Sequence, residues 1–313
     1  MAQQPFKDWK TFAEQIDLLE QRGMVFHDKA QAEKELARIG YYRLSAYWYP
    51  FRQHLATGGR DDVFVANTQF DDVIALYDFD NAIKILALEA IQHIEIAMRT
   101  QIAYTLGKHN PIAHTQAHYF NPKFNHAEWW AKYENLRDHA KDDFVRHNLA
   151  KYGELPVWVA CEIWDFGAMS KLYKMMTERD QRQIEKHFQL FNRELGTHLH
   201  ALNILRNTAA HHGRLWNKHN IGIPSIRFLS DKHNPQWRVL AKYADHVFTT
   251  FCLMQRMLNV ICPQHDWGQR FQAALKAFPM NNAAPHEINL DKMGMGGLSL
   301  ADLSAWQLWK NQA

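Results

Sequence analysis

The sequence predicts an all-α fold, a multi-helix bundle, on three observations. Glycine and proline are sparse, at 14 and 10 of 313 residues, which disfavours a turn-rich β architecture. Apolar residues recur at three- and four-residue steps over segments long enough to be helices. Hydrophobic residues make up 47% of the chain and charged residues 22%, an ordinary globular composition that argues against disorder.

The expected helices follow one another along the chain, and the first ones end at glycines. The first covers 8–22 and ends at Gly23, and the second covers 29–39 and ends at Gly40. The longest covers 71–106, where apolar residues form one continuous face. Further helices are expected over 127–150, from Pro156 onward, and over 168–177, 179–187, 194–212, 237–261, 266–277 and a short stretch around 303–308.

The segments between these helices predict loops. Residues 53–70 are polar, contain Gly58-Gly59 and predict a loop or a short hairpin. Residues 108–125, 213–236 and 279–298 lack helical periodicity. We expect an N-terminal helical and aromatic region over 1–70, a helical core over 71–262 and a C-terminal helical extension over 263–313, together forming one compact unit.

Charge and cysteine content narrow the class of protein. The net charge of +3 permits a nucleic-acid partner without requiring one. The three cysteines (Cys161, Cys252 and Cys262) are odd in number and not at metal-ligand spacing, which predicts reduced thiols. The N-terminal residues lack the apolar core of a signal peptide, and no apolar run is long enough to cross a membrane. We therefore expect a cytoplasmic protein without a membrane partner.

The helix expected over 194–212 carries the most informative pattern. Residues three and four apart share a helix face, so Leu199, Leu202, Leu205 and Ala209 form an apolar stripe. The polar stripe opposite contains Asn203, Arg206, Asn207, Ala210 and His211, and Arg214 extends it. The helix is thus expected to pack through leucines and to present amide, guanidinium and imidazole groups on its other side.

These polar groups suit the cleavage of RNA. RNA supplies its own nucleophile, the 2′-hydroxyl beside each phosphodiester, so a protein needs only to move protons and stabilise the charge on phosphoryl oxygens. Histidine exchanges protons near neutral pH, and arginine offers a charged planar fork to phosphate. His211 would be the general acid/base, Arg206 the phosphate ligand and Asn207 the orienting group, with no metal or cofactor. On the residues alone a structural interpretation is preferred, either a buried polar stripe that bridges helices or a helix C-terminus at which His and Arg stabilise the dipole.

A family resemblance favours RNA cleavage over a structural polar stripe. The segment Arg206-Asn207-Thr208-Ala209-Ala210-His211 matches the Arg-polar-x3-His signature of HEPN-superfamily ribonucleases. The longer string from Leu205 to Asn217 resembles the AbiD/AbiF-type abortive-infection family. Three further segments resemble this family in the expected order, and the likeness covers most of residues 8–280: Ile39–Arg52, Leu76–Thr100 and Trp164–Tyr173.

The resemblance implies several properties that the residues do not show. It implies a HEPN-like helical core, antiviral (phage) defence and a composite RNA-cleaving site built from two copies of the motif. One copy per chain implies a homodimer. AbiF-like members are associated with a small structured non-coding RNA, and related domains form the cutting site of type VI CRISPR effectors. The expected partner is therefore RNA, and the expected supporting or RNA-binding residues are Glu95, Arg99, Asn203, His212, Arg214 and Lys218.

Four other groups of residues admit a functional and a structural interpretation. Glu95 and Arg99 lie four apart, in favourable order for a helical ion pair. In a HEPN arrangement their helix would pack beside Arg206 and hold its guanidinium, but a solvated or structural ion pair is preferred. Aromatic residues of the 41–52 segment, such as Tyr47, Trp48 and Tyr49, offer stacking surfaces for bases, but core packing explains them equally and is preferred.

Metal binding is the weakest of these functional interpretations. The histidines at 109, 114 and 118 lie in the irregular segment 108–125, where a polar loop is preferred over a metal site. Asp78 and Asp80 are interpreted as helix-start caps rather than cation ligands. Three hypotheses follow for the whole protein: a metal-independent endoribonuclease, a non-catalytic module that binds a structured RNA or a protein, and a structural polar stripe at a dimer interface.

Overall fold

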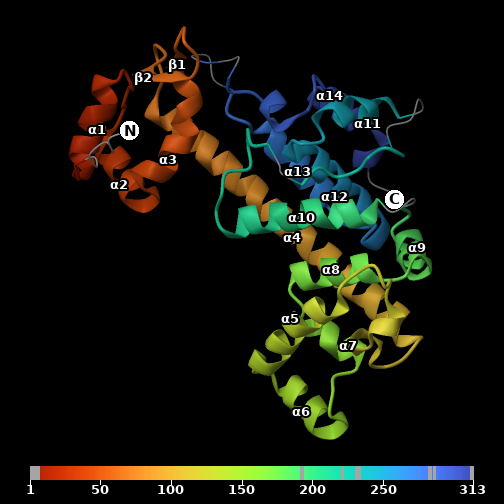
Figure 1. Cartoon of the computed structure of the whole chain (residues 1–313). Helices are drawn as coiled ribbons and strands as arrows, with labels where there is room; N and C mark the ends of the chain where they lie inside the picture. Colours follow the sequence, from red (N-terminus) through yellow and green to blue (C-terminus); the bar gives the residue numbers. More distant parts are fainter. Residues whose placement is uncertain are drawn as a thin grey trace. The chain divides into compact units, whose positions relative to one another are not determined.

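The computed structural model describes residues 8–190, 194–219, 222–229, 234–280, 284 and 287–310. Within these residues the chain is helical throughout, apart from connecting segments and one two-stranded antiparallel hairpin (Figure 1). The predicted all-α, multi-helix fold is confirmed. The chain divides into two compact units, one formed by residues up to 83 together with 273–292, and the other by 84–272 together with 293–313.

The first unit is built on short capped helices and the hairpin. Its elements are α1 (Phe12–Gln21), α2 (Lys29–Ile39), α3 (Tyr41–Trp48), β1 (Arg52–His54) and β2 (Arg60–Phe64). Thr11 and Glu14 form a reciprocal capping box at α1, and the Asp28 side chain caps α2 by accepting from the Gln31 amide. The hairpin confirms the turn expected at Gly58-Gly59.

The aromatic segment 41–52 forms the core of the first unit. Tyr47 and Trp48 are almost fully buried, and the Tyr47 hydroxyl donates a hydrogen bond of 2.7 Å to the buried carboxylate of Asp80. Core packing rather than base stacking is therefore confirmed for these two rings. Tyr49 stays half-exposed at 46%. The interpretation of Asp78 and Asp80 as helix-start caps is wrong, because both lie inside the long helix α4 (Phe70–Gly107).

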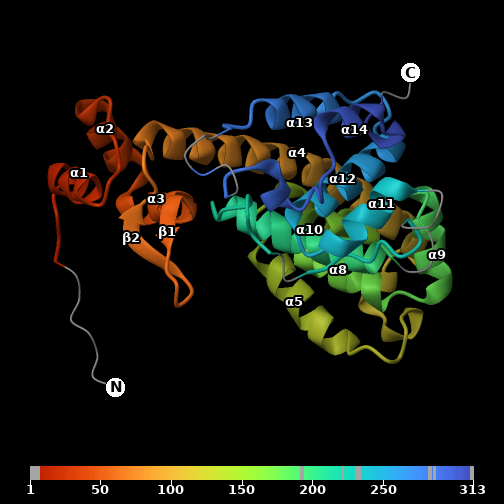
Figure 2. The ribbon, with the colours of Figure 1, turned by 90° about the horizontal axis from the view of Figure 1, so that it is seen from above.

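The second unit holds the remaining helices. They are α5 (His126–His139), α6 (Asp143–Tyr152), α7 (Val157–Ala160), α8 (Phe166–Met175), α9 (Glu178–His187), α10 (Leu195–Ala210), α11 (Pro235–Leu240), α12 (Val247–Ile261), α13 (Trp267–Lys276, its last residues in the first unit) and α14 (Leu300–Ala305). Helix α10 lies between α8 and α12 and packs on both (Figures 1 and 2). Its position places the predicted polar stripe of the sequence next to the start of α8.

Aromatic stacking consolidates the core of the second unit beneath α12. Phe251 stacks on Phe271 with ring centroids 4.5 Å apart, and Trp267 stacks on Phe271 at 5.4 Å. The Trp267 indole donates a hydrogen bond of 2.7 Å to the carbonyl of Leu86 on α4. Each ring buries a large apolar area, so this cluster holds α4, α12 and α13 in fixed register.

Two predicted helices are interrupted. The helix expected over 127–150 is two helices, because Ala140 and Asp142 are extended between α5 and α6. The apolar helix expected over 237–261 begins with α11, passes through a turn over Ala241–Tyr243 and resumes as α12 after the extended residue His246. In both cases apolar residues continue in phase across the break, so periodicity alone does not reveal it.

None of the described helices is both long and apolar enough to span a membrane.

Candidate active site

Helix α10 has the two faces that the sequence predicts. Leu199, Leu202, Leu205 and Ala209 are all buried, at 2% exposure or less. On the other side Asn203 and Arg206 are half-buried, whereas Asn207 is exposed. The leucine face packs against the core, so the amide and guanidinium groups are held at the surface by a well-packed helix.

The helix ends at the motif histidine rather than after it. His211 is the C-cap of α10, and His212 adopts a left-handed conformation with φ of 58°. The His212 amide donates to the Ala209 carbonyl (3.0 Å) and the Gly213 amide to the Thr208 carbonyl (2.8 Å), the pattern of a Schellman cap. The predicted helix therefore stops two residues early, and both histidines are exposed at its C-terminal end.

Gly213 permits this close turn. A methyl group added at Gly213 would lie 3.0 Å from Thr208 Cγ2 and 3.2 Å from the Thr208 carbonyl oxygen. A residue with a side chain would therefore require Thr208 to shift by a few tenths of an ångström. The following residues Leu215 and Trp216 are buried, so the segment after the motif is anchored in the core.

Arg206 and Asn207 line a surface pocket of about 210 Å³. Three elements contribute its walls: Lys132 from α5, Asp165, Phe166 and Gly167 from the start of α8, and Asn203, Arg206 and Asn207 from α10. A methyl group at Gly167 would lie 3.2 Å from Asp165 Oδ1 and 3.6 Å from Lys132 Nζ. The absence of a side chain at Gly167 therefore keeps the space between these charges open.

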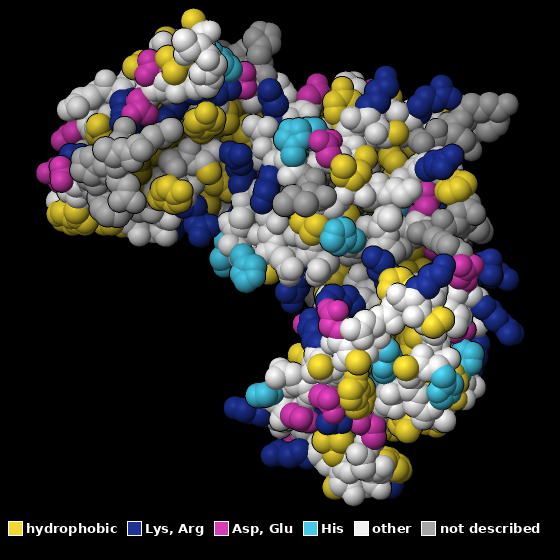
Figure 3. Space-filling view, viewed as in Figure 1, with side chains coloured by type: hydrophobic (Ala, Val, Ile, Leu, Met, Phe, Trp, Pro, Cys, Tyr) yellow, Lys and Arg dark blue, Asp and Glu magenta, His cyan; other side chains and the backbone are white. Residues whose placement is uncertain are grey.

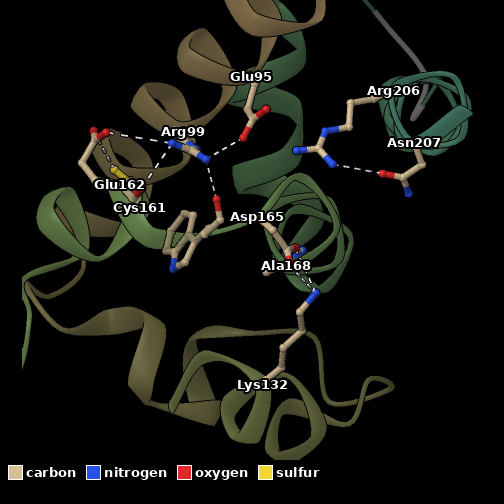
Figure 4. Close-up of polar contacts among 10 residues, drawn as sticks. Glu95, Arg99, Lys132, Cys161, Glu162, Asp165, Ala168, Arg206 and Asn207 are labelled. Atoms are coloured by element: carbon tan, nitrogen blue, oxygen red, sulfur yellow. Dashed lines mark hydrogen bonds and ion pairs between the residues drawn. The ribbon is translucent and has the colours of Figure 1, made fainter. Parts of the chain in front are cut away.

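Two cations and one carboxylate dominate the pocket. Arg206 Nη1 donates to Asn207 Oδ1 at 3.2 Å, while Lys132 Nζ lies 2.9 Å from Asp165 Oδ1 and 2.8 Å from Oδ2. Arg206 and Lys132 extend toward Asp165 from different helices (Figure 4). Burial opposes ionisation of Asp165, but Lys132, the Ala168 amide and Arg206 outweigh it and lower the pKa of the carboxyl. The charges sum to one net positive charge, which suits an anion.

Glu95 and Arg99 brace the backbone before α8. Arg99 Nη2 donates to Glu95 Oε1 and to the carbonyl of Trp164, both at 2.5 Å, and Nη1 donates to the Glu162 carbonyl at 3.3 Å (Figure 4). Between described residues, neither Glu95 nor Arg99 is hydrogen-bonded to Arg206. The preferred interpretation, a structural ion pair, fits these contacts, and the expectation that this helix holds the Arg206 guanidinium stays a prediction.

The other predicted site residues surround the end of α10. His211 lies outside the residues that line the pocket, and no side-chain hydrogen bond from a described residue reaches its imidazole. Arg214 is half-buried and donates to the carbonyl of Asn217 at 3.4 Å, whereas Lys218 is exposed. The structure thus brings Asn203, Arg206 and Asn207 together in the pocket and leaves the imidazoles beside it.

Residues 34–217 match the family model described as Abi-like protein. The chain belongs to the Abi-like family. No curated protein and no solved structure matches it. The matched residues include the whole pocket and the motif from Arg206 to His211. The family supports a role in abortive infection, the defence of a bacterium against phage.

The four pocket residues of this Abi-like protein that lie outside α10 were not predicted as site residues, and two of them, Asp165 and Lys132, are charged. Asp165 belongs to the segment Trp164–Tyr173 that carries the family resemblance, and its side chain caps α8 by accepting from the Ala168 amide at 2.6 Å. That segment contained the signal, because a polar residue at a helix start often faces a neighbouring site. Lys132 gave no signal, since it is one of several charged residues on α5 and only packing brings it to Asp165.

The segment 108–125 is ordered into short turns rather than a plain polar loop. His114 is fully buried, and burial lowers the pKa of its imidazole to about 3. His109 Nε2 lies 3.1 Å from each Asp180 carboxylate oxygen. Of the histidines in the described ranges, 109, 114 and 118 are not grouped as metal ligands. The polar-loop prediction is therefore wrong at His114, which is a neutral core residue.

Proposed function

We propose that this Abi-like protein is a metal-independent endoribonuclease of the HEPN type that acts in phage defence. The observation that supports it best is the pocket of about 210 Å³ that Arg206, Asn207 and Lys132 line. The exposed His211 follows Asn207 by four residues, which is about one helical turn. Cations in an open pocket attract phosphate, and an exposed imidazole exchanges protons with solvent or substrate.

The roles follow from the chemistry of each group. Arg206 presents a guanidinium on a rigid helix, with Lys132 as the second cation, so a phosphodiester is bound by charge-assisted hydrogen bonds. Asn207 already accepts from Arg206 at 3.2 Å, which leaves its amide nitrogen free to donate to a ribose or phosphate oxygen. Gly167 provides the space that the phosphate would occupy.

The reaction uses the nucleophile of the RNA itself. Neutral His211 accepts the proton of a 2′-hydroxyl while that oxygen forms a bond to the adjacent phosphorus. The bond from phosphorus to the 5′-oxygen breaks, and that oxygen takes a proton from an imidazolium or from water. The products are one end with a 2′,3′-cyclic phosphate and one end with a 5′-hydroxyl.

A second copy of the chain would complete the site. His211 lies outside the pocket that Arg206 and Asn207 line, so the lining of the pocket in a single chain does not include the motif imidazole. A two-fold dimer with α10 near its axis brings two arginines and two histidines to one phosphodiester. We propose this homodimer, and light scattering with and without RNA tests it; a strict monomer at high concentration contradicts it.

One observation favours an alternative function, an RNA-binding module without cleavage. The pocket holds two cations, but the ion pair between Lys132 and Asp165 already neutralises one of them, and His211, the proposed general base, is not among the residues that line the pocket. Such a site would bind the phosphates of a structured RNA and leave the backbone intact. On the face shown in Figure 3, Lys and Arg side chains are interspersed with acidic ones, so binding would depend on local pockets rather than on a uniformly basic surface.

Cleavage products separate the two functions. RNA that co-purifies with the protein is sequenced and its ends are mapped, and purified protein is incubated with that RNA in excess chelator. We expect 2′,3′-cyclic phosphate ends, no cleavage of the same sequence made with 2′-O-methyl ribose, and no cleavage by His211→Ala. Exposed His200 on the same helix is the matched control, and His200→Ala should cleave as wild type. Binding of RNA without new ends would instead establish the binding module.

A further inference from the structure

Two histidines and an aspartate gather beyond the proposed active site, where the segment after α10 meets the start of α12. His219 Nδ1 lies 2.8 Å from Asp245 Oδ2, and His246 Nδ1 lies 2.8 Å from Asp245 Oδ1. One ligand atom from each of the three residues can be chosen so that all lie within 4.8 Å of one another. This is the one such cluster among the described parts of the chain.

The backbone fixes the positions of these residues. His219 and His246 are paired in an isolated antiparallel bridge, and their ring centroids are 4.3 Å apart. The His246 amide donates to the Tyr243 carbonyl at 2.9 Å. Gly294 packs so closely that a methyl group there would lie 2.3 Å from His246 Cβ. The cluster is therefore held by backbone contacts from three separate segments and does not depend on side-chain pairing alone.

We propose that His219, Asp245 and His246 bind one divalent transition-metal ion of the zinc type. Imidazole nitrogens select such ions over calcium and magnesium, which prefer oxygen ligands. Tetrahedral zinc with bonds of about 2.0–2.1 Å places its ligand atoms about 3.3 Å apart. The two contacts of 2.8 Å end on different oxygens of Asp245, so the carboxylate faces both imidazoles, and a contact to the oxygen that binds the ion needs to lengthen by about half an ångström to reach this spacing.

The exposure of the cluster leaves room for the rest of the coordination shell. The His219 side chain is 69% exposed, and Asp245 and His246 are 36% and 18% exposed. Solvent therefore reaches the ion from the side of His219, and water supplies the fourth ligand. Bound there, the ion joins the segment that follows the motif helix to the N-terminus of α12, and it acts on stability rather than on the reaction.

This inference is independent of the proposed ribonuclease activity, since a purely RNA-binding protein would carry the same ion. The same geometry without an ion is a hydrogen-bonded row of imidazole, carboxylate and imidazole. The two states differ in a measurable way, because only the first binds zinc with one ion per chain and raises the melting temperature.

The test is a titration of chelator-treated, tag-free protein with zinc chloride by calorimetry, repeated with cobalt chloride by visible absorption. We expect one zinc per chain, a cobalt absorption band typical of nitrogen and oxygen ligands, and a higher melting temperature with zinc. His219→Ala, whose side chain is mostly exposed and expendable for folding, should weaken binding at least about tenfold, as should Asp245→Asn.

The matched control is His54, another exposed histidine paired with a carboxylate, at 65% exposure beside Glu287. His54→Ala should bind zinc as wild type does. Absence of zinc binding by wild type overturns the proposal. Binding that survives both His219→Ala and Asp245→Asn overturns it as well, because the ion would then be adventitious. Circular dichroism of each variant excludes unfolding as the cause of a loss.

Discussion

Replacing Arg99 by alanine tests whether this arginine stabilises the fold rather than taking part in the function. Arg99 and Glu95 are only 19% and 18% exposed, and Arg99 donates to two backbone carbonyls as well as to the Glu95 carboxylate. The substitution leaves these three acceptors without their cationic donor. Hydrogen bonds to charged groups contribute about 1.5–3 kcal/mol each, and removal of one partner of a buried ion pair costs about 3–5 kcal/mol.

Water reaches the partly exposed edge of the pair and replaces some of the lost contacts. We therefore expect the free energy of unfolding to fall by about 3 kcal/mol. At about 2–4 °C per kcal/mol for a unit of this size, the melting temperature should fall by roughly 6–12 °C. Arg99→Lys should restore only part of the loss, because an ammonium group cannot donate in the fixed fork geometry of the guanidinium.

Differential scanning calorimetry measures this effect, with Arg146→Ala as the control. Arg146 is 69% exposed and pairs with an Asp143 that is 95% exposed, so its removal should leave the melting temperature unchanged. An Arg99→Ala protein that melts as wild type but no longer protects against phage would refute the reasoning. Arg99 would then be a functional residue, and the ion pair with Glu95 would not hold the backbone before α8.

Three further predictions follow from the structure. His212→Gly should raise the free energy of unfolding by about 1 kcal/mol, because it relieves a left-handed conformation. Burial lowers the pKa of His114 to about 3 and of His198 to about 4, so the unfolded chain binds protons first and stability should fall below pH 6.5 by up to about 1.4 kcal/mol per pH unit for each. Lys218→Ala should reduce the slope of log RNA affinity against log salt by about 0.7–0.9.

Each of these has a clear contrary result. A His212→Gly protein less stable than wild type would show that the imidazole makes a stabilising contact. A free energy of unfolding that is flat between pH 6.5 and 4 in urea titrations would show that the two imidazoles are not held neutral. RNA affinity that is insensitive to salt would remove the phosphate contacts assigned to the segment after α10.

Much of the fold is predictable from local pattern. The helix expected over 71–106 is α4, because its apolar residues repeat at helical spacing and no glycine or proline occurs among them before Gly107. The two stripes of α10 are equally predictable, since residue spacing alone sets helix faces. The end of α10 was less predictable, because Gly213 occupies the second position beyond the C-cap and His212 takes the left-handed position usually filled by glycine.

The helix break before α12 and the positions of the charged residues around the pocket depend on contacts between distant segments. The break before α12 coincides with the bridge between His219 and His246, which no local pattern reveals. Lys132 lines the pocket only because α5 packs against α8. The Arg99 guanidinium is held by a hydrogen bond to the carbonyl of Trp164, which is 65 residues away in the sequence. The sequence therefore predicts the helix that carries the motif, whereas the charged residues that line its pocket from other helices can be identified only in the folded structure.

Phage plating with Arg206→Ala and His211→Ala tests the central claim most directly. Both side chains project from the polar side of α10, so the buried leucine face should keep the fold intact. Loss of a positioned proton-transfer group costs on the order of a hundredfold or more in rate. The controls are Arg182→Ala and His200→Ala, which remove exposed residues of the same types in the same unit. We predict that the first two variants melt as wild type and lose protection while the controls retain it. Full protection by well-folded Arg206→Ala and His211→Ala proteins would contradict the claim.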